Sequence, residues 1–211
     1  MVCVKKGEIM AKRDQVFNEL QKILVEFREE LENERAAFIL KEAQLNINFK
    51  GTLEDIVYYQ SDRDKIYTML GYDVEVIGKL GGIFDRLNLK HVGDRDTRIV
   101  INLLNGLMRV AYSIQIIFRD ILNQTKLDML KFRDTSDLEK IIQYLVHFIE
   151  MVKDLMLQVR VVIASAASKT NENDILRELN RVISSPDAKI NRGMRNICYL
   201  LFDIIELVDL L

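Results

Sequence analysis

Arg86 and His91, an arginine and a histidine with four residues between them, come nearest in this sequence to a catalytic pair. The only other histidine is His147, and two histidines are too few for a histidine-based metal site. The segment 78–82 contains three glycines, but it has neither the spacing of a phosphate-binding loop nor that of a dinucleotide fingerprint. We find no other nucleophile, metal or phosphate motif. The sequence therefore favours a protein that is not an enzyme, with no metal and no cofactor.

The spacing of Arg86 and His91 resembles the Arg-x4-His signature of HEPN-type helical ribonucleases. In that family the two residues serve the cleavage of a phosphodiester bond, and dimerisation commonly forms the site. The resemblance implies a ribonuclease as the alternative function. It covers these two residues only, and Leu87 follows the arginine where the family usually has a polar residue. The other interpretation is that His91 is an ordinary surface histidine.

The composition is that of a globular protein with long helices. The 211 residues are 49% hydrophobic and 29% charged, which allows a large single core and predicts one domain. One proline and nine glycines leave few turns. The net charge of −2 gives no reason to expect nucleic acid as a partner. Cys3 and Cys198 lie far apart and no secretory signal precedes the fold, which predicts free thiols and a cytoplasmic location.

Residues 1–9 are expected to be an extension that is not part of the natural protein. Residues 5–8 can be encoded by a purine-rich stretch just before the codon of Met10, as in a bacterial ribosome-binding site translated in frame. This hypothesis implies a bacterial or phage source and a single helical-bundle domain over 10–211. A coincidental choice of codons is the alternative, and the intact mass of the native protein would distinguish the two.

The expected centre of the fold is an apolar helix near 95–132. Between Arg98 and Arg119 the only charged residue is Arg109, which we expect to reach a carboxylate on a facing helix. Such a helix is either the core helix of a bundle or a membrane span. A charge near the middle opposes insertion into a membrane, so we expect a core helix. The polar positions left on it are Asn102, Asn105, Arg109 and Tyr112 or Ser113.

The remaining pattern predicts an all-α fold, an elongated bundle of about seven helices, three of them longer than thirty residues. For the segment 72–93 the pattern leaves helix and strand open and favours a weak helix interrupted by glycines. The charged residues of 26–35 are expected to form a solvated face, with an interaction patch as the alternative. Besides the central helix and 72–93, the expected helices are 11–48, 52–70, 136–168, 173–184 and 186–211.

The last helix has the most regular heptad pattern, which is typical of a coiled coil. Its predicted helix–helix interface consists of Ile190, Met194, Ile197, Leu201, Ile204 and Val208. Further apolar residues, among them Phe202 and Ile205, suggest a second apolar face beside an acidic strip. We expect one face to pack on the protein's own bundle and the other to contact a second copy. The alternative is a helix buried within one chain.

These patterns predict a non-enzymatic, cytoplasmic helical-bundle protein. We expect it to act by self-association, as a homodimer, or by binding another helical protein. Two alternatives stay open. One is the ribonuclease that uses Arg86 and His91. The other is a membrane-active bundle that releases its glycine-rich hairpin or its central helix into lipid.

Overall fold

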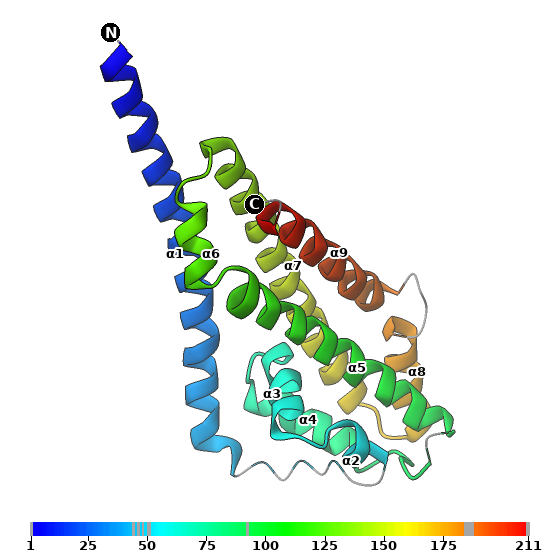
Figure 1. Cartoon of the computed structure of the whole chain (residues 1–211). Helices are drawn as coiled ribbons and strands as arrows, with labels where there is room; N and C mark the ends of the chain where they lie inside the picture. The colour runs from blue at the N-terminus through cyan, green and yellow to red at the C-terminus, as the bar shows by residue number, and fades with distance from the viewer. Residues whose placement is uncertain are drawn as a thin grey trace.

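The computed structural model describes residues 2–43, 45, 47, 49, 52–91, 93–183 and 188–209. Over these residues the protein is an all-α multi-helix bundle without a β-strand, as predicted. It has nine α-helices and one π-helical turn, η1 (Figure 1). In chain order they are α1 (Val2–Glu42), α2 (Thr52–Ile56), α3 (Gln60–Met69), α4 (Val74–Phe84), α5 (Arg95–Gln115), η1 (Ile116–Ile121), α6 (Gln124–Leu130), α7 (Thr135–Ala167), α8 (Glu172–Ile183) and α9 (Lys189–Asp209).

Two helices organise the bundle. Helix α7 packs against α1, α4, α8 and α9, and α5 packs against α3, α8 and α9. Helix α1 has 41 residues, which is about 62 Å at the rise of an α-helix, and its amino-terminal part extends beyond the other helices (Figure 1). Its buried side chains include Phe17, Leu20, Leu24 and Phe27, which keep the predicted three-and-four spacing. The proposed non-native origin of residues 1–9 stays a prediction.

Helix α5 is a core helix with one polar strip, as its sequence predicts. Asn102, Asn105, Arg109 and Tyr112 are exposed, whereas Ser113 is buried and donates its hydroxyl to the carbonyl of Arg109. The prediction that Arg109 meets a carboxylate of a facing helix is wrong: α5 turns Arg109 to solvent, and it has no ion pair within the part of the chain described above.

The helical stretch Arg95–Ile121 is long and apolar enough to cross a membrane. Half of its most apolar part is buried inside the protein. The core helix of a bundle passes the same test of length and composition, so this test alone carries no argument for a membrane.

The expected continuous helix over 95–132 is interrupted. It ends in η1, where the amide of Leu122 donates to the carbonyl of Ile117 at 2.8 Å, a π-type bond. Asn123 then caps α6, because its side chain accepts from the amide of Lys126 at 3.0 Å. Of the three expected long helices, α1 and α7 exceed thirty residues, and the third is 27 residues long including η1.

The region between α1 and α5 also differs from the expected pattern. The single helix predicted over 52–70 is divided into α2 and α3 by residues 57–59. The segment 72–93 contains the helix α4, which the side chain of Asp73 caps by accepting from the amides of Glu75 and Val76. Its glycines lie within the helix and do not interrupt it. The proposed start of the last helix at residues 185–186 lies outside the described residues.

Candidate binding groove

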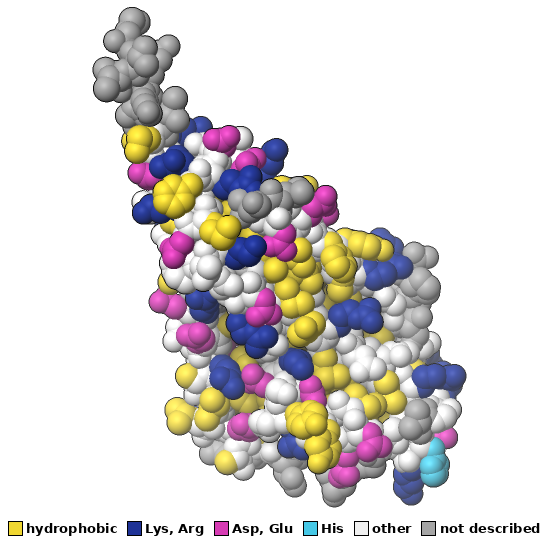
Figure 2. Space-filling view, viewed as in Figure 1, with side chains coloured by type: hydrophobic (Ala, Val, Ile, Leu, Met, Phe, Trp, Pro, Cys, Tyr) yellow, Lys and Arg dark blue, Asp and Glu magenta, His cyan; other side chains and the backbone are white. Residues whose placement is uncertain are grey.

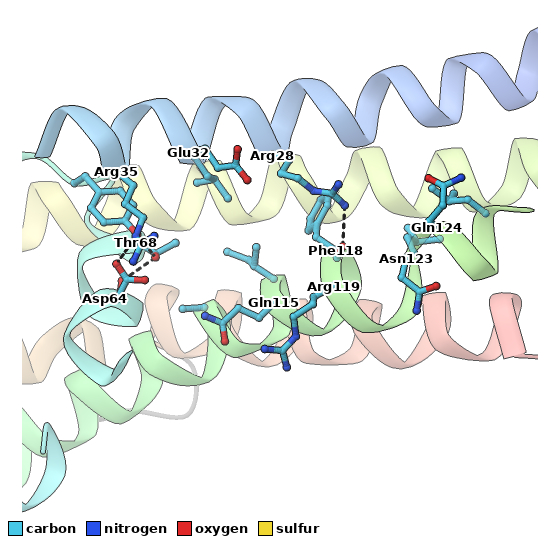
Figure 3. A pocket seen from close by; sticks show the side chains of 16 residues that line it. Arg28, Glu32, Arg35, Asp64, Thr68, Gln115, Phe118, Arg119, Asn123 and Gln124 are labelled. Carbon is cyan, nitrogen blue, oxygen red and sulfur yellow. Dashed lines mark hydrogen bonds and ion pairs between the residues drawn. The ribbon is translucent and has the colours of Figure 1, made fainter. Parts of the chain in front are cut away.

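A groove with a cavity of about 680 Å³ lies between α1 on one side and α5, η1 and α6 on the other, with α3 at one end (Figure 3). It is open to solvent along its side. Helix α1 contributes Arg28, Leu31, Glu32 and Arg35, and α3 with the following turn contributes Asp64, Thr68 and Tyr72. The opposite wall consists of Ala111, Ile114, Gln115, Phe118, Arg119, Leu122, Asn123, Gln124 and Leu127.

The floor of the groove is apolar and its edges are polar. Ala111, Ile114, Phe118, Leu122 and Leu127 are all buried, so they form the floor and continue into the hydrophobic core. The charged groups on the edges come from both walls and include both signs: Arg28 and Glu32 on α1 and Arg119 on η1 are exposed. An apolar floor between polar edges is the usual composition of a binding interface.

A hydrogen-bonded network closes the end of the groove at α3. Arg35 Nε donates to Asp64 Oδ1 at 2.9 Å, and the Tyr72 hydroxyl donates to the same oxygen at 2.9 Å. The hydroxyl oxygen of Thr68 lies 3.1 Å from that of Tyr72, and the Thr68 hydroxyl donates to the backbone carbonyl of Asp64 at 2.8 Å. The hydrogen bond that Arg35 donates to the Asp64 carboxylate raises the pKa of Arg35. The network ties α1 to α3.

Tyr72 takes an unusual backbone conformation to reach this network. The φ angle of Tyr72 is +50° and that of the preceding Gly71 is +62°, so two consecutive residues have a left-handed backbone conformation. This region is costly for a bulky residue, and the hydrogen bonds of the Tyr72 hydroxyl offset part of that cost. Burial raises the pKa of Tyr72 to about 12. The side chain therefore keeps its proton, and its ability to donate, well into alkaline pH.

A second tie holds α1 to η1. Arg28 Nη2 donates to the backbone carbonyl of Phe118 at 2.8 Å (Figure 3). Carbonyls at the end of a helix lack partners within the helix, and the helix dipole favours a positive charge there. Arg28 thus satisfies a carbonyl of the π-helical turn from another helix, 90 residues away in sequence.

The two carboxylates of the groove differ in their surroundings. Asp64 accepts from Arg35 and from the Tyr72 hydroxyl, whereas Glu32 is exposed. Among the residues the structure describes, no group of three histidine, cysteine, aspartate or glutamate side chains could hold a metal ion.

The structure places Arg86 and His91 away from this groove. Arg86 donates to three carbonyl oxygens: Gly82 at 2.8 Å, Lys169 at 2.6 Å and Ala167 at 3.1 Å. It therefore caps the carboxyl end of α7. His91 is exposed beyond α4. The ribonuclease alternative stays a prediction, and it would require Arg86 to leave these bonds.

The six predicted interface residues of α9, from Ile190 to Val208, are all buried. Helix α9 packs on α7 and α5, and a methyl group added to Gly106 would overlap the sulfur of Met194. The six residues therefore form a helix–helix interface within the chain. Contact with another chain stays a prediction for the outer face of α9.

The sequence did not reveal the groove, because its walls come from distant parts of the chain. Arg28 and Arg35 belong to the charged stretch 26–35, for which an interaction patch was only the alternative. One signal was present: Ile117, Leu122 and Leu127 are spaced by five, which departs from α-helical spacing.

A scan against protein-family models finds no match for the chain, and no curated protein is significantly similar to it.

Proposed function

We propose that this chain is a non-enzymatic, cytoplasmic binding protein whose groove receives a helical segment of a partner protein. The observation that carries the proposal is the groove itself, which is open to solvent between polar edges and has the buried side chains of Ala111, Ile114 and Phe118 at its floor. Helix-in-groove recognition uses this arrangement: an amphipathic helix places its apolar face on the floor and its polar face toward the edges.

The dimensions fit a short helix. Arg28 and Arg35 lie seven residues apart on α1, which is about 10 Å and two helical turns. A partner helix of two turns presents apolar residues at positions i, i+3 or i+4, and i+7. A small organic ligand is normally buried over most of its surface, and this groove is open along one side. The openness favours a macromolecular partner.

The two ties support a groove that exists before binding. The Arg28–Phe118 bond and the Arg35–Asp64 pair hold α1 against η1 and α3 at two separate points. A preformed site lowers the entropy lost when a ligand is ordered. The edges of the groove expose Arg28, Arg119 and Glu32. We therefore expect a partner helix with both positive and negative charges beside its apolar residues.

A selection experiment tests the proposal. A displayed library of helical peptides is selected on the wild type and counter-selected on Gln115→Trp, which adds a large side chain to the groove. We expect enriched peptides with apolar residues at helical spacing that bind the wild type at least tenfold more tightly than Gln115→Trp. Gln143→Trp is the matched control, because Gln143 is exposed on α7, and it should bind like the wild type. Equal binding to all three proteins would refute the groove as the site.

A further inference from the structure

The outer face of α9 carries a second seam with regular spacing. Its residues alternate three and four positions apart and are all exposed, with Tyr199 65% and Phe202 64% accessible. Hydrophobic side chains gather over α9 on the face shown in Figure 2. We call this the outer seam: Arg192, Arg195, Tyr199, Phe202, Glu206 and Asp209.

The charges of the outer seam are arranged in order along the helix. Arg192 and Arg195 lie in the amino-terminal half, Glu206 and Asp209 in the carboxyl-terminal half, and the aromatic residues between them. A helix dipole favours the reverse order, with negative charge at the amino end. The order therefore opposes the dipole of α9 itself. Within the chain, Lys126 pairs with Asp209 at 2.9 Å.

We propose that the outer seam binds a second copy of this chain, with the two α9 helices antiparallel about a two-fold axis between Tyr199 and Phe202. Reversing one helix about this point places Tyr199 against Phe202 of the second copy. It also places Arg195 opposite Glu206 of the second copy, and the same pair recurs on the other side of the axis. Such an interface is isologous, because each copy uses the same surface. A parallel pairing would oppose like charges.

The geometry of the seam suits this contact. Three-and-four spacing is the pattern by which two helices pack at a small crossing angle. Helix α9 lies on the outside of the bundle, with α7 and α5 on its inner side (Figure 1). Exposed aromatic residues at the centre with charges around them match the usual anatomy of an interface. One helix pair of 21 residues is a small interface, so we expect a weak dimer with micromolar affinity.

Sedimentation velocity on the full chain at micromolar concentrations tests the pairing. The wild type should form dimers. Arg195→Glu and Glu206→Arg should each weaken dimerisation roughly tenfold, because each opposes like charges at both copies of the pair. The double variant should regain wild-type affinity, and an equimolar mixture of the two single variants should form a heterodimer. Asp203→Arg is the matched control, because it makes the same change of charge off the seam.

Three outcomes would overturn the proposal. The first is a wild type that stays monomeric at all micromolar concentrations. The second is a double variant that stays as weak as the single variants although its thermal melting equals that of the wild type. The third is loss of the dimer in Asp203→Arg to the same extent as in Glu206→Arg. The groove between α1 and α5, η1 and α6 has no part in this contact between copies, so binding of helical peptides to the groove should persist in every variant.

Discussion

Arg86 donates a hydrogen bond to the carbonyl oxygen of Lys169 at 2.6 Å, across 83 residues of sequence. A second bond reaches the carbonyl of Ala167, the last residue of α7. The last carbonyls of a helix have no partner within it, and a cation there is favoured by the helix dipole. Arg86 thus joins the end of α4 to the end of α7, and this contact accounts for an arginine at that position without any catalytic role.

Arg86→Ala should lower the free energy of unfolding by about 1 kcal/mol, because the carbonyls at the end of α7 lose their donor. Denaturant unfolding measures the change. His91→Ala is the matched control, because His91 is exposed, and it should leave the midpoint unchanged. Unchanged stability of Arg86→Ala, combined with loss of RNA cleavage in both variants, would instead favour the ribonuclease alternative.

Two glycines should respond to alanine in opposite directions. Gly82 lies inside α4 and a methyl group there meets no atom within 4 Å, so Gly82→Ala should stabilise by about 0.5–1 kcal/mol. Gly71 has φ +62°, and its methyl group would overlap the guanidinium of Arg160, so Gly71→Ala should destabilise by at least about 1 kcal/mol. The melting temperatures of both variants, compared with that of the wild type, measure these two changes in stability. Equal effects would contradict the described turn after α3.

The protein should lose stability in alkali. Burial raises the pKa of both Tyr67 and Tyr72 from 10.0 to about 12. Below pH 10 the two tyrosine hydroxyls keep their protons in both the folded and the unfolded state. Above pH 10 the hydroxyls lose their protons in the unfolded chain first, so the free energy of unfolding falls as the pH rises toward 12. Denaturation midpoints across this range should fall, and less steeply in Tyr67→Phe. Tyr58→Phe, at a side chain 73% exposed, should follow the wild type.

Leu104→Asp should prevent folding, because Leu104 is fully buried in α5 and the variant places an unpaired charge there. We expect a loss of more than about 4 kcal/mol, measured by circular dichroism and denaturant unfolding. The neighbouring Asn105→Asp is the control, because Asn105 lies on the exposed strip of α5. Cooperative, wild-type-like unfolding of Leu104→Asp would contradict the packing of α5.

The periodic elements of the fold could be predicted from the sequence. The polar strip of α5 follows from helical spacing alone, and the buried seam of α9 from Ile190 onward follows in the same way. Helix α7 begins within one residue of its predicted start and ends one residue before its predicted end. In each case one face of a single helix decides the outcome, so local sequence suffices.

Features that depend on distant residues could not be predicted. The end of α5 at η1 involves a change of hydrogen-bond pattern and the donation from Arg28 on α1 to the carbonyl of Phe118. The identity of the helices that cover the α9 seam, α7 and α5, also depends on distant residues. The groove requires both the turn at Leu122 and the position of α1. Apart from the five-residue spacing of Ile117, Leu122 and Leu127, these contacts leave no periodic signal in their own segments.

The π-helical turn has a consequence for the history of this chain. Since an α-helix rotates by about 100° per residue, removal of one residue from 116–121 would turn the residues that follow within η1 by that angle relative to α5. The groove would then lose the carbonyl of Phe118 as the acceptor of Arg28, and Leu122 would leave the floor. Among homologous sequences, a one-residue gap at this point would separate lineages with the groove from lineages without it.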